Sequence, residues 1–312
     1  MKTLLQTICI RRSFKFKLIF TTIFIASIVF QLLANGLVFA EERSKNQFTV
    51  RVVGQGKPVI LIPGLMSDAR VWQGLSTALA KHYQLHLVNL AGFGKTPAIE
   101  RPSLHDVKTQ LLSYIEQNKL QNPAVIGHSL GGFMAFWLAS SQPDSIGAVI
   151  SIDGLPYIGP VFTHSNTSTV TSLAAQATQY RDMYQLMSQQ QLSAQSRYGL
   201  AIQATSAEAQ AKVMAMIATS DPTTVGEAIY TLLSTDLRQD IANIKAPTML
   251  LGASGGFDNK AQQAAAEQLY QEQLAALPKA KLKMNTQSRH FIMFDDPQWL
   301  NAQIREFLGA TL

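Results

Sequence analysis

Cysteine is almost absent from this chain of 312 residues, which contains one, Cys9. Residues 41–312 therefore contain no thiol, so that part of the protein has no disulfide, no thiolate metal site and no cysteine nucleophile. Cys9 also precedes the long apolar run of the N-terminal segment, where it is not placed as a lipid-attachment cysteine.

Closely spaced metal ligands are absent as well, since the histidines are scattered and form no His-Glu-x-x-His or His-x-x-Glu-His pair. The segment Gly92-Phe93-Gly94 superficially looks like a phosphate loop, but it lacks the third glycine and the acidic partner of a dinucleotide site. We therefore expect neither a metal ion nor a cofactor.

An excess of charge is present only near the N-terminus. The chain has 26 Lys and Arg against 20 Asp and Glu, but five of the basic residues and none of the acidic ones lie within residues 1–40. The remainder is nearly neutral, so its composition gives no reason to expect a nucleic acid or a membrane surface as a partner.

Residues 1–40 resemble a targeting segment. Basic residues precede an almost uninterrupted apolar run from Leu18 to Leu33, and Val38-Phe39-Ala40 then fits a signal-peptidase cleavage site. We expect a signal peptide that ends before Glu41 and a periplasmic or secreted mature protein. The alternative is an uncleaved N-terminal anchor in the inner membrane, because the run is long enough to span a bilayer.

From residue 48 onward, short apolar runs alternate with helix-like segments. The expected strands are 48–53, 58–62, 85–89, 124–127, 148–152, 247–251 and 280–284, and the expected helices are 71–82, 104–118, 132–141, 260–277 and 297–308. This alternation predicts an α/β fold with a mostly parallel, doubly wound sheet. Ligands bind such sheets at the carboxyl ends of the strands.

The alternation stops after Asp153. Residues 154–243 are rich in Ala, Gln, Ser, Thr and Met, with helical periodicity and no convincing strand. We interpret them as a helical cap inserted into a core formed by residues 41–153 and 244–312.

The most informative motif is Gly127-His128-Ser129-Leu130-Gly131, which follows an apolar run and precedes a helix-like segment. A strand, a sharp glycine-flanked turn with serine and a helix together make a nucleophile elbow. The turn lifts the Ser129 hydroxyl clear of the sheet, where a base can remove its proton. Ser129 is therefore the expected nucleophile.

His290 is the expected base among six histidines. It lies after the last expected strand and before the final helix, where an imidazole can reach over the elbow. His128, although it adjoins Ser129, is expected to point away from it and to have a packing role.

Five segments resemble the α/β-hydrolase superfamily in their order and spacing, over essentially all of residues 48–310. They are Leu61-Ile62-Pro63-Gly64-Leu65 with Trp72, residues 90–96, the elbow around Ser129, Ile244-Lys245-Ala246-Pro247-Thr248, and Arg289-His290-Phe291. The resemblance implies a Ser-acid-His hydrolase with an inserted cap.

The position of the acidic residue of the triad departs from the commonest family pattern. It is usually expected a few residues past the strand that ends at Leu251, but residues 252–256 there are Gly, Ala, Ser, Gly and Gly, and the first acid is Asp258. Asp153, at the end of the preceding strand, is the alternative, and some family members place the acid there. Asp153 and Asp258 both remain candidates for the acid of the triad. Asp153 is preferred because a strand end holds a carboxylate more rigidly than a glycine-rich loop.

The oxyanion hole of such an enzyme needs two backbone donors. Leu130 follows the nucleophile and supplies one amide, and the loop after Ile62 supplies the other, from Leu65 or Met66. Met66 and Phe291, with Leu65 and Trp72, are expected to line an apolar pocket for the acyl group.

Together these features predict an exported, carboxylesterase-like serine hydrolase that cleaves a small ester or related acyl compound through an acyl-enzyme. Its expected partner is a small-molecule acyl substrate, with membrane contact only through an uncleaved N-terminal segment. The alternatives are lactone, amide or carbon–carbon bond hydrolysis on the same triad, or a non-catalytic hydrolase-like ligand-binding protein. No sequence feature indicates an oligomeric state or the substrate.

Overall fold

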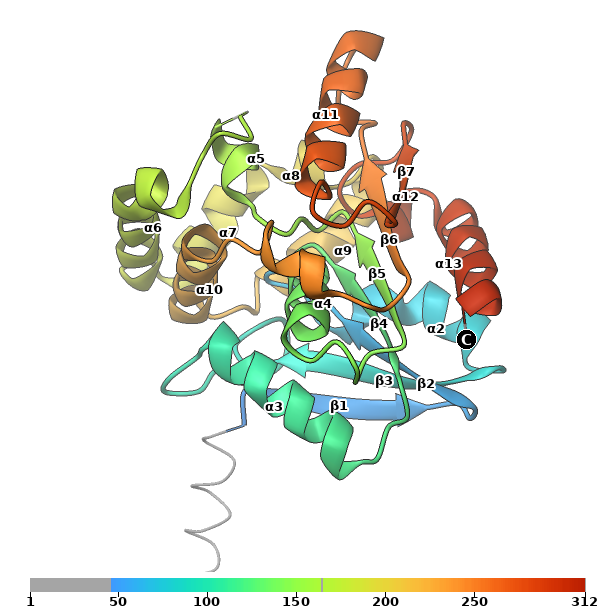
Figure 1. The fold of residues 1–312 in the computed structure, drawn as a ribbon. Coiled ribbons are helices and arrows are strands. Elements are labelled where there is room, and N and C mark those ends of the chain that lie inside the picture. The colour runs from blue at the N-terminus through green and yellow to red at the C-terminus, as the bar shows by residue number, and fades with distance from the viewer. Residues whose placement is uncertain (1–45, 164, 312) are drawn as a thin grey trace, which may run out of the picture. The chain divides into compact units, whose positions relative to one another are not determined.

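A seven-stranded sheet runs through the computed structural model, which describes residues 46–163 and 165–311 (Figure 1). The strands are β1 (Phe48–Val53), β2 (Lys57–Ile62), β3 (Tyr83–Leu90), β4 (Ala124–His128), β5 (Ala148–Ile152), β6 (Thr248–Ala253) and β7 (Lys281–Asn285). Their order is β1-β3-β2-β4-β5-β6-β7. Only β1 pairs antiparallel, with β3, and the other pairings are parallel. The predicted mostly parallel sheet is confirmed.

Helices cover both faces of the sheet. Those flanking it are η1 (Ala69–Trp72), α2 (Gln73–Leu79), α3 (Leu104–Gln117), α4 (Leu130–Ser141), α11 (Lys260–Gln273), α12 (Ile292–Asp295) and α13 (Pro297–Thr311). The pair α3 and α4 packs on one face, and the pair α2 and α13 packs on the other (Figure 1).

The central strands β4 and β5 are buried at every position. Such strands are continuously apolar because helices cover both of their faces. Their register pairs His128 with Ile152, the last residue of each strand. The residues that follow, Ser129 and Asp153, are therefore brought to the same edge of the sheet.

The described part of residues 154–243 consists of helices and loops and contains no strand. The helices are α5 (Gly159–Thr163), α6 (Val170–Gln185), α7 (Gln189–Arg197), α8 (Leu200–Gln203), α9 (Ala207–Ile217), α10 (Pro222–Ser234) and η2 (Asp240–Asn243). The two long helices, α6 and α10, pack along one another (Figure 1). The Asp221 side chain accepts a hydrogen bond from the Thr224 amide, and proline occupies the first turn of α10, both favourable at a helix start.

The predicted signal peptide or anchor, residues 1–40, lies outside the described residues. Within residues 46–163 and 165–311, no helix combines the length and the apolar character that crossing a bilayer requires.

Candidate active site

Ser129 occupies a sharp turn between β4 and α4. Its backbone has φ 53° and ψ −117°, a left-handed conformation that is uncommon for a residue with a side chain. The Ser129 amide donates a 2.9 Å hydrogen bond to the carbonyl of Ile152, which ties the turn to the end of β5. Strained conformations of this kind cost about 1–3 kcal/mol and persist only where the surroundings impose them.

Two glycines make this turn possible by allowing backbones to approach closely. A Cβ atom at Gly127 would collide with the carbonyl of Gly131, and one at Gly131 would collide with the carbonyl of Ile62. The turn is thus packed against its own helix and against the end of β2.

His290 lies between β7 and α12, and its imidazole meets the carboxylate of Asp153. Nδ1 of His290 is 2.6 Å from Oδ2 of Asp153, and the Asp153 side chain is only 7% exposed. Because an ionised carboxylate can only accept hydrogen bonds, Nδ1 carries the proton. The other ring nitrogen, Nε2, is thereby left as the acceptor in the neutral imidazole.

Asp153 is held from two further directions. Its Oδ1 accepts 2.8 Å hydrogen bonds from the Ala253 amide and from the Tyr270 hydroxyl. Burial, followed by the charge of Asp153, raises the pKa of Tyr270 well above its ordinary value, so this hydroxyl stays protonated and donates. Sequence reasoning gave Tyr270 no role, because nothing in its local pattern distinguishes it from other tyrosines in helices.

Asp258, the other acid considered, is exposed and lies in the loop before α11. Its backbone amide donates to Oε1 of Gln262 at 3.2 Å. Among the described residues, no hydrogen bond or ion pair joins Asp258 to His290. The geometry therefore places Asp153, and not Asp258, against the histidine.

His128 is fully buried and contacts the His290 segment. Its Nε2 is 3.1 Å from the backbone carbonyl of His290, and the two rings are 4.6 Å apart between centroids. A carbonyl can only accept, so Nε2 of His128 carries the proton. Burial, followed by repulsion from His290, lowers the pKa of His128 well below its ordinary value, which keeps the ring neutral.

The role predicted for His128 was packing alone, because one residue in a motif does not reveal which distant loop it touches. In the structure, the His128 side chain contacts two distant loops. A Cβ atom at Gly64, in the loop after β2, would lie 2.8 Å from Nδ1 of His128 and 3.1 Å from Cβ of Ser129. His128 therefore lies between the loop after β2 and the loop that carries His290.

Leu130, one of the residues expected to supply oxyanion donors, directly follows Ser129 in the chain. Leu130 begins α4, where backbone amides have no partner inside the helix and the helix dipole favours negative charge. Leu65 and Met66 directly follow Gly64, and Met66 has a left-handed φ of 56°. The hydrogen bonds of the described residues include none from the Leu65 or Leu130 amide.

His128 directly precedes Ser129 in the chain and contacts the backbone and the ring of His290. The hydrogen bonds of the described residues do not include one between the Ser129 hydroxyl and the His290 imidazole. Phe291, expected to line a substrate pocket, is only 3% exposed and stacks on Phe294 with the rings 5.6 Å apart.

Both chain neighbours of His290 are bonded to the helical segment. The Phe291 amide donates to the carbonyl of Gln203 at 2.8 Å, and the Arg289 guanidinium donates to the carbonyl of Ala201. Asp295 accepts from the Thr205 amide at 2.8 Å and from the Arg289 amide at 2.8 Å. Residues 201–205 are therefore fastened to the loop that carries the imidazole.

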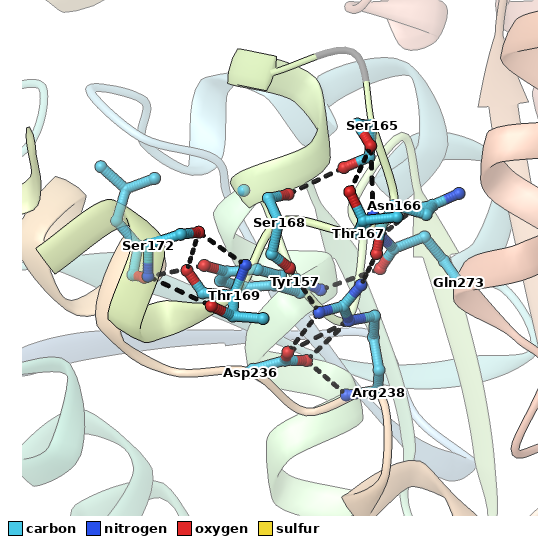
Figure 2. A network of polar contacts seen from close by, with 12 residues as sticks. Tyr157, Ser165, Asn166, Thr167, Ser168, Thr169, Ser172, Asp236, Arg238 and Gln273 are labelled. Carbon is cyan, nitrogen blue, oxygen red and sulfur yellow. Dashed lines mark hydrogen bonds and ion pairs between the residues drawn. The ribbon is translucent and has the colours of Figure 1, made fainter.

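Figure 2 shows a second polar network, which joins the two ends of the helical segment. The Arg238 guanidinium pairs with Asp236 at 2.6 Å and donates to the carbonyls of Asn166 and Ser168 at 2.6 and 2.8 Å. It also lies over the ring of Tyr157, 4.9 Å from the centroid. Tyr157, Asn166 and Ser168 are thereby held to residues 236–238, where the segment leaves and rejoins the sheet.

Metal ligands were not expected from the sequence. In the part of the chain that the structure describes, no three His, Cys, Asp or Glu side chains are grouped so that they could hold a metal ion.

Curated relatives match part of this chain. The pimeloyl-(acyl-carrier protein) methyl ester esterase of Aeromonas salmonicida is 36% identical over 110 residues, which are 35% of this chain and 42% of that protein. The enzyme of the same name from Vibrio cholerae is 29% identical over 106 residues, 34% of this chain and 40% of that protein. The chain thus spans about two fifths of the length of these relatives.

Solved structures match nearly all of the fold. An enol-lactonase from Burkholderia xenovorans has a TM-score of 0.68 at 18% identity, covering 84% of this chain and 96% of that one. MenH from S. aureus has a TM-score of 0.70 at 15% identity, covering 85% and 99%. At such identities the likeness extends to the fold alone, which many chemistries share.

A family model described as the alpha/beta hydrolase fold matches residues 57–297, from the start of β2 to the start of α13. This range contains the elbow of Ser129, the carboxylate of Asp153 and the imidazole of His290. The chain therefore belongs to the α/β hydrolase fold family.

Proposed function

We propose that this protein is a serine hydrolase that cleaves a small ester through an acyl-enzyme intermediate. The observation that carries the proposal is the 2.6 Å hydrogen bond between Asp153 and His290, formed at the edge of the sheet where Ser129 sits on its strained turn. A carboxylate that fixes the protonated Nδ1 leaves Nε2 free to accept a proton from a hydroxyl.

The proposed reaction begins when Oγ of Ser129 attacks the ester carbonyl and its proton passes to Nε2 of His290. The negative charge of Asp153 stabilises the imidazolium that forms. The amides of Leu130 and of Leu65 or Met66 donate to the oxyanion of the tetrahedral intermediate. The imidazolium then protonates the departing alcohol, and the acyl group remains on Ser129.

In the second half of the cycle, Nε2 of His290 removes a proton from water, and the resulting hydroxide attacks the acyl-enzyme. Collapse of the second tetrahedral intermediate releases the acid and returns the proton to Ser129. The described hydrogen bonds include none between Ser129 and His290, and such bonds often tighten only when substrate is bound.

We also propose that residues 154–243 act as a cap that shapes the substrate site. The hydrogen bonds of residues 201–205 to the His290 loop support this role, as does the 2.7 Å bond from the Asp221 amide to the carbonyl of Gly92 after β3. Similarity to methyl ester esterases over about a third of the chain supports an ester, more than a lactone or an amide, as the substrate.

The proposed localisation is the periplasm or the exterior, after removal of residues 1–40. It is supported by the basic residues and the apolar run of that segment. Edman sequencing of the protein purified from its own host tests it. A mature N-terminus at Glu41 is expected, and an intact Met1 would support an anchor instead.

The central test is Ser129→Ala in the full chain. The variant should lose hydrolysis of short p-nitrophenyl esters and covalent labelling by a fluorophosphonate, because both need the same hydroxyl. Ser140→Ala, which removes a buried hydroxyl elsewhere in α4, is the matched control and should retain both. Labelling that persists in Ser129→Ala would remove Ser129 from the mechanism, and a wild-type protein that no serine-directed probe labels would favour a ligand-binding protein.

A further inference from the structure

The carboxylate of Asp153 is shared between two kinds of partner. Oδ2 faces His290, whereas Oδ1 accepts from the Ala253 amide and from the Tyr270 hydroxyl, each at 2.8 Å. Ala253 is the last residue of β6 and Tyr270 lies in α11, so the two donors reach the same oxygen from different elements.

Tyr270 reaches Asp153 by crossing the end of β6. A Cβ atom at Gly252 would lie 2.9 Å from Cδ1 of the Tyr270 ring and would also collide with Met284. The lack of a side chain at residue 252 therefore leaves the space through which the tyrosine passes. Gly252, the first of the acid-free residues 252–256, is thus part of the arrangement that supports Asp153 after β5.

We propose that Tyr270 is a positioning residue, which holds the carboxylate of Asp153 in the orientation that His290 requires. The inference rests on the proposed function for its kinetic consequence and on geometry alone for its effect on His290. Two donors on Oδ1 fix the rotation of the carboxylate, so Oδ2 stays directed at Nδ1. The hydroxyl also draws negative charge toward Oδ1 and away from the imidazole.

Among the described residues, titratable side chains approach the Asp153–His290 pair from two other elements. Tyr270 approaches Asp153 from α11, and His128 approaches His290 from β4. Arg289 adjoins His290 in the chain, and its amide is bonded to Asp295. Within residues 46–163 and 165–311, only Tyr270 donates a side-chain hydrogen bond to Asp153 besides His290 itself, so removing that hydroxyl changes one interaction of the carboxylate.

The test is Tyr270→Phe in the full chain, compared with Tyr157→Phe. Tyr157 is a matched control because it is buried, and its hydroxyl donates to the carbonyl of Leu233 at 3.2 Å, outside the site. In substrate-free protein, the titration of the His290 imidazole is followed by carbon NMR, with its resonance assigned from His290→Gln. With p-nitrophenyl esters, kcat and KM are measured as a function of pH.

In Tyr270→Phe, the midpoint of the His290 titration should move up by roughly 0.5 to 1 pH unit, because the carboxylate then stabilises the imidazolium more strongly. The acid limb of kcat/KM should move with it. Because one of the two donors that fix the rotation of the carboxylate is lost, His290 is oriented less well, and kcat should fall about tenfold with KM nearly unchanged. Tyr157→Phe should match the wild type in all three measurements.

An unchanged titration in folded Tyr270→Phe would overturn the inference, as would equal shifts in both tyrosine variants. A wild-type protein without esterase activity would refute the proposed function, but the NMR titration would still decide the role of Tyr270. Gly252→Ala keeps the hydroxyl and crowds the ring of Tyr270. It should shift the titration in the same direction, and it decides the question if Tyr270→Phe does not fold.

Discussion

Asp153 and His290 are 137 residues apart in the sequence, yet their side chains meet at 2.6 Å across the end of β6. Asp153 follows β5 and His290 follows β7, and β6 lies between these two strands. The carboxylate therefore has to lean over the end of β6, where the Ala253 amide supports it.

The identity of the acid leads to the first prediction. Asp153→Asn keeps the shape of the side chain but removes the charge that, in the proposed mechanism, stabilises the imidazolium and fixes the tautomer of the neutral ring. We expect kcat for a short p-nitrophenyl ester to fall on the order of 10⁴-fold. Asp258→Asn, the matched control, should retain nearly full activity because Asp258 is exposed and away from His290. Near-normal turnover by Asp153→Asn would exclude Asp153 as the acid.

The second prediction concerns the pH dependence of stability through His128. Burial keeps the folded pKa of this residue well below its unfolded value of about 6.5. As the pH falls below that value, the unfolded chain binds a proton that the folded protein cannot, so stability is lost. The contribution of His128 to the free energy of unfolding should decrease by about 1.4 kcal/mol per pH unit in this range.

This contribution is measured by urea unfolding between pH 5 and 8, as the difference in the free energy of unfolding between the wild type and His128→Gln at each pH. Glutamine places an amide donor near the position of Nε2 but does not titrate, so the variant should lose less stability on acidification than the wild type. His82→Gln, a change at an exposed histidine, serves as the control. Parallel pH curves for wild type and His128→Gln would contradict the assignment.

The third prediction concerns the packing of the elbow. Gly127→Ala places a methyl group against the carbonyl of Gly131, and overpacking of this kind should lower the free energy of unfolding by about 3 kcal/mol and disturb Ser129. Gly74→Ala, in α2, is the control, since nothing lies within 4 Å of its added Cβ atom. It should stabilise the protein by about 0.5–1 kcal/mol, as alanine favours helix. Urea unfolding of both variants measures the difference. Equal free energies of unfolding for Gly127→Ala and Gly74→Ala would show that the turn accommodates a methyl group at residue 127.

Most of the fold could be predicted from the sequence because buried parallel strands are short, continuous apolar runs. β4 and β5 are buried throughout, and their expected ranges agree with the structure to within a residue. Boundaries were less accurate where side chains, and not periodicity, determine the start of a helix. The helix expected at 71–82 begins as η1 at Ala69, because the Asp68 carboxylate accepts from the Arg70 amide, and α2 ends at Leu79.

The site could be predicted only where a residue has a local pattern. Ser129 stands in a five-residue motif, and His290 stands at a recognisable place between the last strand and the last helix. The choice between Asp153 and Asp258 depends on which carboxylate crosses β6, and that is a property of the packed sheet. His128 and Tyr270 act through contacts with distant segments, so neither could be identified from its own surroundings in the chain.

The bonds that hold Arg289 and Phe291 have a mechanical consequence. Arg289 and Phe291, on either side of His290 in the chain, are hydrogen-bonded to residues 201–205. Residues 201–205 therefore cannot move away from this loop unless those hydrogen bonds break or the loop that carries His290 moves with them. In the proposed mechanism, a substitution that removes the Thr205 hydroxyl, which donates to Oδ2 of Asp295 at 2.9 Å, would act on turnover through the anchorage of His290 without touching a reacting atom.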